Sequence, residues 1–359
     1  MLIDINIPGS DYQVRVGSPI EDLKEYLPDF IFADRVYIIT DSNVGKLYGE
    51  ELKNIFSSAG FTPDYIEIPA GEKFKSLASA ESIIADMCSK KVERFTPVIG
   101  FGGGVIGDLA GFAASIYMRG LPFINIPTSL IAQVDSSIGG KTGVNLEFGK
   151  NLVGTFHQPL HVYTDIELLR TLPESEYRSG LGEAVKHALI KGEKFLKFME
   201  ENIEDILKIK SGPAEIMVAE CIKIKGEIVV KDEKEEGLRR VLNLGHTLGH
   251  ALEAVSGYGK IKHGDGVAAG TVAAAEISRQ LGYACEDYLS RIRSLFLACG
   301  LPVKFPSGTD IKELVNYAYM DKKVRDGKIL FVLPVSPGKV EPAVEVDEEQ
   351  VIKAARKLS

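Results

Sequence analysis

The sequence predicts an α/β fold in two parts: a Rossmann-like, doubly wound, mostly parallel sheet in an N-terminal domain, and a mainly α-helical C-terminal domain. Short β-branched runs alternate with amphipathic helical patterns in the first half, as in parallel sheets with right-handed crossovers. Past Pro173 long helical patterns dominate. Because 359 residues are long for one domain, we expect a division into residues 1–160 and 161–359.

The elements of the first domain follow from residue type and period. Strands are predicted over Leu2–Ile7, Tyr12–Val16, Val36–Thr40, Tyr65–Ile68, Pro97–Phe101 and Phe123–Ile126. Helices are predicted between them over Val44–Ala59, Ser76–Lys90 and Val105–Arg119.

The second domain has the period of helices almost throughout. Helices are predicted over Glu174–Ile190, Glu193–Lys210, Ala214–Val230, Gly245–Ser256, Val267–Gly282, Asp287–Cys299 and Asp310–Tyr319. A hairpin over Lys322–Val335, turning at Asp326-Gly327, is expected to interrupt them.

Composition and charge indicate a soluble cytoplasmic protein. The chain has 45% hydrophobic and 26% charged residues and a net charge of −8, which argues against binding to nucleic acid or to an anionic membrane. We find no signal peptide and no apolar run long enough to span a membrane. Four cysteines without paired spacing favour a reducing compartment. Any anionic ligand must therefore be held by a local basic cluster.

A glycine turn follows the strand ending at Phe101. It fits the spacing Gly102-x-Gly104-x-x-Gly107 and opens a helix. Such a turn lets a pyrophosphate approach backbone N–H groups at a helix N-terminus. Many strand–helix turns need glycine for backbone geometry alone, so the motif by itself leaves both interpretations open.

The acidic residue that usually follows such a turn by about 20 residues is missing, since the next strand ends in Pro127-Thr128-Ser129. Asp41 ends an earlier strand instead. We expect an adenosine near Asp41 and the pyrophosphate on Gly103–Gly107. Asp108, in the first helical turn, either complements the helix dipole or contacts a ribose.

Histidines cluster in the helical half. His246 and His250 are four residues apart, so both can face one ion, and His263 follows in another glycine-punctuated segment. Glu183 offers a carboxylate. This set favours a site with two histidines, one carboxylate and open positions for a catalytic divalent ion such as zinc. The alternative is a pair of helix histidines bonded to backbone or to each other.

Basic residues recur in the same segments, several of them beside glycine, asparagine or acidic residues. They are Arg119, Lys141, Lys150, Lys186, Lys225, Arg239 and Lys322. Lys141 lies in Ser137–Gly143, where glycines bring backbone and ammonium together around an anion. Spacing alone assigns Arg119 to capping the C-terminus of the helix that starts at the glycine turn.

Together these segments resemble the 3-dehydroquinate synthase family of sugar phosphate cyclases. The most specific blocks are Gly102–Asp108 and Val134–Thr142. Thr40–Asn43, Pro69–Lys75 and Asp321–Lys323 extend the resemblance over nearly the whole chain. The resemblance implies an NAD-binding first domain, a metal- and substrate-binding second domain, an active site in the cleft between them, and a homodimer.

The resemblance also implies roles for individual residues. The metal ligands would be Glu183, His246 and His263, with His250 beside the metal or facing the substrate. NAD would be contacted by Asp41, Asn43, Glu72, Lys75, Gly103, Gly104, Val105, Asp108, Thr128, Ser129, Lys141 and Lys150. Substrate or metal-bound hydroxyls would be contacted by Asp135, Lys141, Lys150, Asn151, Lys186, Lys225, Arg239 and Asn243. Arg119 would reach the substrate phosphate across a dimer interface, contrary to the capping role, and Lys322 or Lys323 would bind the carboxylate.

The implied reaction converts 3-deoxy-D-arabino-heptulosonate 7-phosphate to 3-dehydroquinate and phosphate, in the shikimate pathway of aromatic amino-acid biosynthesis. A hydroxyl polarised by zinc or cobalt loses its hydride to NAD, phosphate leaves by β-elimination, the hydride returns, and the opened ring closes by an aldol step. Three alternatives are a sister cyclase for glucose 6-phosphate or sedoheptulose 7-phosphate, a metal-dependent alcohol dehydrogenase that would accumulate NADH, and a binding protein without activity.

Overall fold

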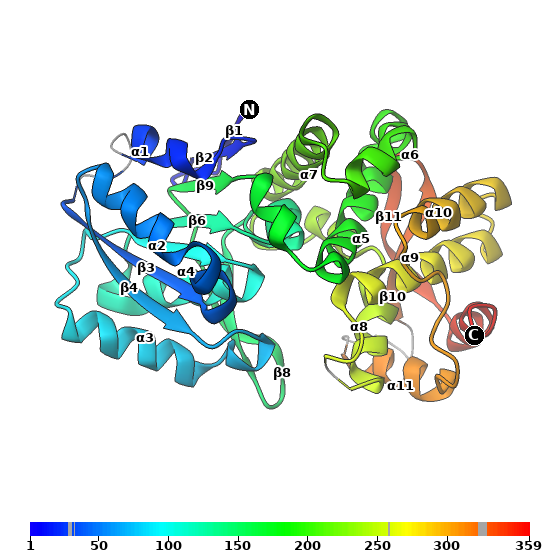
Figure 1. The fold of residues 1–359 in the computed structure, drawn as a ribbon. Helices are drawn as coiled ribbons and strands as arrows, with labels where there is room; N and C mark the ends of the chain where they lie inside the picture. The colour runs from blue at the N-terminus through cyan, green and yellow to red at the C-terminus, as the bar shows by residue number, and fades with distance from the viewer. Residues whose placement is uncertain (28–30, 32, 258, 322–328) are drawn as a thin grey trace. The chain divides into compact units, whose positions relative to one another are not determined.

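The computed structural model describes residues 1–27, 31, 33–257, 259–321 and 329–359. The chain divides into two compact units, Met1–Leu172 and Pro173–Ser359 (Figure 1). The predicted boundary after residue 160 falls just before a strand, His161–Thr164, that pairs with the sheet of the first unit. Residues 161–172 therefore fold with the first unit.

The first unit is built on a seven-stranded sheet of order β1-β2-β9-β6-β5-β3-β4. Its strands are β1 (Leu2–Ile5), β2 (Tyr12–Val16), β3 (Arg35–Asp41), β4 (Thr62–Ile68), β5 (Val98–Gly102), β6 (Phe123–Pro127) and β9 (His161–Thr164). Neighbours pair in parallel except β1 with β2, which confirms the mostly parallel sheet predicted from the sequence. Neither β9 nor the separate hairpin of β7 (Lys141–Leu146) and β8 (Gly149–Phe156) was predicted.

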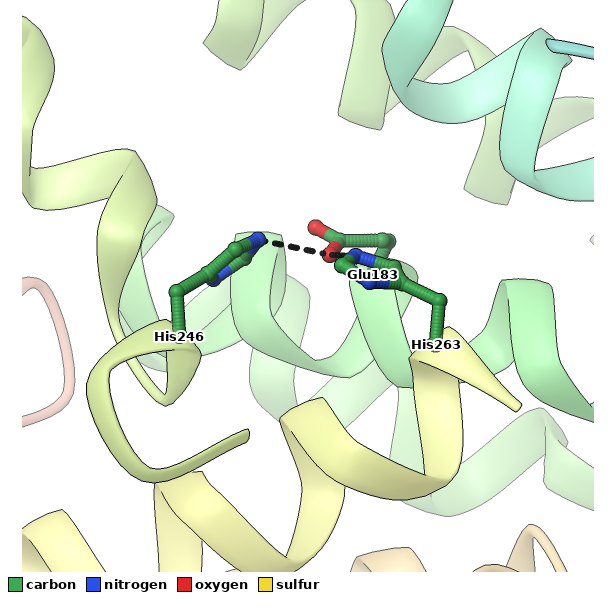
Figure 2. A group of neighbouring side chains, drawn as sticks. All are labelled: Glu183, His246 and His263. Carbon is green, nitrogen blue, oxygen red and sulfur yellow. Dashed lines mark hydrogen bonds and ion pairs between the residues drawn. The ribbon is translucent and has the colours of Figure 1, made fainter. Parts of the chain in front are cut away.

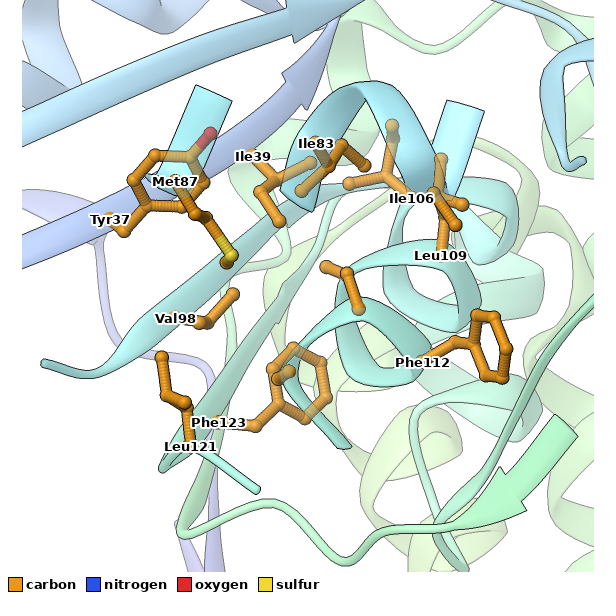
Figure 3. Close-up of a cluster of buried hydrophobic side chains, with 14 of the residues drawn as sticks. Tyr37, Ile39, Ile83, Met87, Val98, Ile106, Leu109, Phe112, Leu121 and Phe123 are labelled. Atoms are coloured by element: carbon orange, nitrogen blue, oxygen red, sulfur yellow. The ribbon is translucent and has the colours of Figure 1, made fainter. Parts of the chain in front are cut away.

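Helices cover this sheet and enclose its core. They are α1 (Leu23–Tyr26), α2 (Ser42–Ser58), α3 (Leu77–Ser89) and α4 (Gly104–Ile116). Val98 of β5 is buried with Ile83 and Met87 of α3 and with Ile106 and Leu109 of α4 (Figure 3). Burial of each such side chain is worth about 1.5–3 kcal/mol. The apolar helix α4 is thus fixed against the sheet, which sets where its N-terminus lies.

The second unit is mainly helical, as predicted. Its helices are α5 (Glu174–Lys191), α6 (Glu193–Leu207), α7 (Ser211–Lys231), α8 (His246–Val255), α9 (His263–Gln280), α10 (Glu286–Ala298), α11 (Ile311–Asp321) and α12 (Glu348–Arg356). The hairpin differs from the expectation: its turn at Asp326-Gly327 lies outside the described residues, and β10 (Ile329–Ser336) pairs with β11 (Lys339–Val346) across Pro337-Gly338. No helix among the described residues is both long and apolar enough to cross a membrane.

Helix α9 is the centre of the second unit, with α5, α8, α10, α12 and β10 packed around it (Figure 1). Glycines bring it into backbone contact with two neighbours. A Cβ atom at Gly264 of α9 would overlap the carbonyl oxygen of Ser179 on α5, and one at Gly270 would overlap that of Gly245 before α8. The three helices therefore approach more closely than side chains would allow.

We expect Gly264→Ala to lower the free energy of unfolding by about 1–3 kcal/mol, because overpacking must push α9 away from α5. The matched control is Gly212→Ala in the first turn of α7, where a Cβ meets nothing within 4 Å. Its helix propensity predicts a gain of up to about 1 kcal/mol. Urea unfolding measures both, and equal stability of the two variants would contradict the packing argument.

Candidate active site

Three potential metal ligands of the second unit converge on one point (Figure 2). Glu183 lies within α5, whereas His246 and His263 are the first residues of α8 and α9. The Nε2 atoms of His263 and His246 lie 3.2 and 3.4 Å from the same Oε1 atom of Glu183. Each ligand neighbours a glycine in the sequence, so the close helix packing also brings these side chains together.

The outer nitrogen of each histidine ring has its own hydrogen-bond acceptor. The Nδ1 atom of His263 lies 2.9 Å from Oε1 of Glu253, and that of His246 lies 3.1 Å from the carbonyl oxygen of Leu244. Both Nδ1 atoms therefore carry protons, and both Nε2 atoms face a carboxylate oxygen that can only accept. A positive charge is required between them. One carboxylate oxygen and two imidazole nitrogens form the donor set of catalytic zinc sites, so these residues fit a divalent cation.

Burial and neighbouring charges set the protonation of the three ligands. Burial raises the pKa of Glu183, but Lys186 and the two histidines outweigh it and hold that pKa well below its usual range. Burial keeps the pKa of His246 well below its usual value. The ring is therefore neutral, and this is the form that binds metals. Burial also lowers the pKa of His263, but hydrogen bonds to Glu183 and Glu253 raise it to about 9. Glu183 is therefore ionised and His246 neutral, and a metal ion would displace the proton from His263.

His250, the other histidine of the i, i+4 pair, lies differently. It is exposed on α8, with its ring centroid 5.1 Å from that of His246 and 5.8 Å from that of His263. It belongs to a second group of potential ligands with Glu253 and His263. His250 thus lies next to the group formed by Glu183, His246 and His263 and is not part of it.

Three of the predicted cationic residues of the second unit are buried. Lys186 is 1% exposed and pairs with Glu183, and Lys225 and Arg239 are 6% and 3% exposed. The amide of Asn243 donates to Oε1 of Glu235 at 2.7 Å. Lys322 and Lys323 lie outside the described residues.

Asp232 organises the loop that carries Arg239 and Asn243. Its carboxylate accepts hydrogen bonds from the backbone N–H groups of Glu236, Gly237 and Arg239 at 2.8, 2.8 and 2.9 Å. Asp232 is not among the residues predicted from the sequence. The available signal was an aspartate directly after a helix and ahead of a glycine, which is typical of side chain–backbone turns.

In the first unit the predicted cofactor residues meet at the carboxyl edge of adjacent strands. Asp41 ends β3 and accepts a hydrogen bond from the N–H of Asn43, and Gly103 is the N-cap of α4 after β5. Thr128 and Ser129 follow β6, which pairs with β5. The glycine turn is tightly lined, since a Cβ at Gly103 would lie 3.2 Å from the Ser129 hydroxyl and one at Gly104 3.0 Å from that of Ser136. Together with Val105, this turn fits a pyrophosphate at the start of α4.

A second group in this unit is centred on Lys75. This buried ammonium lies 2.5 Å from both Oδ2 of Asp108 and Oδ1 of Asn151. Asn145 donates to Oε1 of Glu72 at 2.7 Å, which ties the same segment to the β7–β8 hairpin. Asp108 thus pairs with the Lys75 ammonium in addition to complementing the dipole of α4. Lys75, which is predicted to contact NAD, thus contacts both Asp108, another predicted NAD residue, and Asn151, a predicted substrate residue.

The remaining predicted residues of the first unit lie on the segments around this hairpin. Asp135 is in a π-helical turn, Ala132–Ser136, and Lys141 begins β7 after Gly139 and Gly140, whose φ angles are 94° and 63°. Lys141 and Lys150 are both exposed.

Arg119 does not cap α4. The helix ends at Ile116, and the N–H of Tyr117 closes it on the Ala113 carbonyl. Met118 and Arg119 both have left-handed backbones, with φ angles of 48° and 68°. Such strain clusters at functional sites. Within the described chain no hydrogen bond or ion pair holds the exposed guanidinium.

Comparison with known proteins identifies the family. Residues 65–179 match the N-terminal domain of 3-dehydroquinate synthase, and residues 180–324 match its C-terminal domain. The chain belongs to the 3-dehydroquinate synthase family. A curated 3-dehydroquinate synthase from Symbiobacterium thermophilum is 44% identical over 96% of this chain and 94% of its own.

Solved structures of other cyclases are similar to the fold of this family member. A 2-deoxy-scyllo-inosose synthase complexed with carbaglucose-6-phosphate, NAD+ and Co2+ has a TM-score of 0.92 at 25% identity, with both chains covered fully. A 2-epi-5-epi-valiolone synthase from Streptomyces hygroscopicus subsp. jinggangensis with NAD+ and Zn2+ bound has a TM-score of 0.89 at 28% identity, covering 97% of this chain and 96% of the other. The predicted fold class is confirmed.

We expect Asp232→Ala to release the loop of residues 232–239. The backbone N–H groups of this loop, with that of Arg239 contributing most, hold the pKa of Asp232 below its usual range. The loop is therefore ordered at neutral pH and loosens only as the pH falls through this depressed pKa. Losing hydrogen bonds to a charged acceptor, about 1.5–3 kcal/mol each, predicts at least roughly tenfold faster amide exchange.

Hydrogen exchange read by mass spectrometry measures this effect on the peptide that contains Arg239. Asp205→Ala, which removes a surface ion pair with Lys210, is the control. Unchanged exchange in Asp232→Ala would show that the loop is held by other contacts.

Proposed function

We propose that the chain catalyses the 3-dehydroquinate synthase reaction, converting 3-deoxy-D-arabino-heptulosonate 7-phosphate to 3-dehydroquinate and phosphate with NAD and a divalent metal ion. The observation that carries the proposal is the convergence of Glu183, His246 and His263 in a chain whose two halves both match the family. Solved cyclases bound to NAD+ with Co2+ or Zn2+ support the same cofactors.

Each cofactor has its own set of residues in the proposal. The metal is held by Glu183, His246 and His263. NAD would be held by Asp41, the glycine turn and Thr128–Ser129, with Lys75 and Asp108 as further contacts. When bound, the metal polarises a substrate hydroxyl and NAD accepts and returns a hydride.

Fixed cations hold the substrate, which carries a phosphate and a carboxylate. Because the chain has a net charge of −8, these groups need a local basic cluster. Lys186, Lys225 and Arg239 are buried, so their ammonium and guanidinium groups keep one orientation and act at low dielectric. The family resemblance assigns substrate contacts to Lys141 and Lys150 of the first unit as well, and these roles and the carboxylate-binding role of Lys322 or Lys323 stay predictions.

The same proposal includes a homodimer in the cytoplasm. Ile116, Met118, Leu152 and Phe156 are 43–61% exposed. Thr155 donates to Ser115 at the end of α4, so these apolar side chains lie on neighbouring segments. A second copy would cover them and receive Arg119 at its substrate phosphate.

The reaction is tested by following phosphate and NADH together on the heptulosonate phosphate. We expect phosphate release without growth of NADH absorbance, since the hydride is returned in each turnover, and loss of activity after metal chelation with recovery on adding Zn2+ or Co2+. Stoichiometric NADH without free phosphate would indicate an alcohol dehydrogenase. Turnover of glucose 6-phosphate or sedoheptulose 7-phosphate instead would indicate a sister cyclase.

The dimeric site is tested by complementation. Lys141→Ala and Arg119→Ala should each be folded and inactive, because each removes a cation that grips the substrate. A refolded equimolar mixture should regain about one quarter of wild-type activity, since half of the dimers are mixed and each mixed dimer has one intact site. Equally low activity before and after mixing would place Arg119 in its own subunit's site, and near-normal turnover by Lys141→Ala would remove the anion-binding argument.

A further inference from the structure

We infer that Glu253 is a positioning residue that fixes His263 as a metal ligand through its Nδ1 atom. The inference rests on the metal site of the proposed function. Glu253 lies near the end of α8 and is 4% exposed. Its Oε1 atom is 2.9 Å from Nδ1 of His263, on the side of the ring opposite Glu183.

The packing of α8 on α9 holds this contact in place. Gly249 of α8 and Gly266 of α9 are so close that a Cβ at Gly249 would lie 2.8 Å from the Gly266 carbonyl oxygen. α8 therefore carries His246 at its first residue and Glu253 two turns later, both against the start of α9. One helix supplies a ligand and the acceptor that orients the other histidine.

The chemistry of the two histidines differs because of these acceptors. An acceptor at Nδ1 keeps the proton on that atom and directs the Nε2 lone pair to the metal. His246 has a neutral acceptor, the Leu244 carbonyl, whereas His263 has a carboxylate. The charge of Glu253 makes the His263 ring more basic and hence a stronger donor. Removal of such outer partners typically weakens metal binding about 10–100-fold.

Glu253 also belongs to a second possible ligand group, with His250 and His263. In that arrangement Glu253 would bind the ion itself, and His263 would use its Nδ1 atom. The geometry favours the first arrangement, because the rings of both His246 and His263 point toward Glu183 (Figure 2). Glu183 is 1% exposed, whereas His250 is exposed.

The test compares Zn2+ affinity of metal-free wild type, Glu253→Gln and Glu253→Ala by competition with a chromophoric chelator. We expect Glu253→Ala to bind about 10–100-fold more weakly. Glu253→Gln keeps an acceptor without the charge and should fall between, which also preserves the test if the alanine variant misfolds. Glu220→Gln, in a surface ion pair with Lys223, is the control and should bind like wild type. NAD+ affinity reports on folding and should not change.

The Co2+ forms add a spectroscopic readout that a merely structural role would not move. We expect the visible absorption bands of bound Co2+ to shift in both Glu253 variants and not in the control. Wild-type affinity and spectrum in both Glu253 variants would overturn this inference and leave the proposed function standing. So would anomalous scattering from Co2+ centred on Glu253 and His250 rather than on Glu183. A wild-type protein that binds neither ion would instead overturn the proposed function.

Discussion

The second unit depends on backbone contact between α9 and its neighbours α5 and α8. Helices that meet through side chains pack with their axes 8–10 Å apart, and glycines permit a closer approach. Gly182 precedes Glu183, Gly245 precedes His246, and Gly264 follows His263. The residues that allow the contact are therefore the direct neighbours of the proposed ligands, so a change in helix spacing would also change the distance between Glu183 and both imidazoles.

The same packing creates an electrostatic problem that the surrounding residues solve. A buried carboxylate such as Glu183 is costly unless it is paired. Lys186, one turn later on α5, and the two histidines provide that pairing. In the first unit Lys75 has the corresponding position between Asp108 and Asn151. Both units thus hold buried charged side chains in fixed positions, which suits them to bind charged ligands without reorganisation.

Sequence patterns predicted most of the fold, because alternating and helical periods depend on local burial. They missed β9, whose four residues pair with strands far away in sequence, and they missed the pairing of β10 with β11. Spacing also paired His246 with His250, since i, i+4 is a local signal. The approach of His263 and Glu253 to that site is tertiary, and no period in the sequence reports it.

The proposed histidine ligands are not equivalent, because only His263 has a carboxylate at its Nδ1 atom. Both histidines are first residues of helices, where the positive end of the dipole disfavours an imidazolium. Burial lowers the pKa of His246, whereas at His263 hydrogen bonds to Glu183 and Glu253 outweigh burial and raise the pKa to about 9. Without a metal the charge between His263 and Glu183 is therefore a proton, and a divalent cation must displace it. Glu253 lies on the other side of the ring, at Nδ1, so the exchange of proton for metal at Nε2 would leave this orienting hydrogen bond in place.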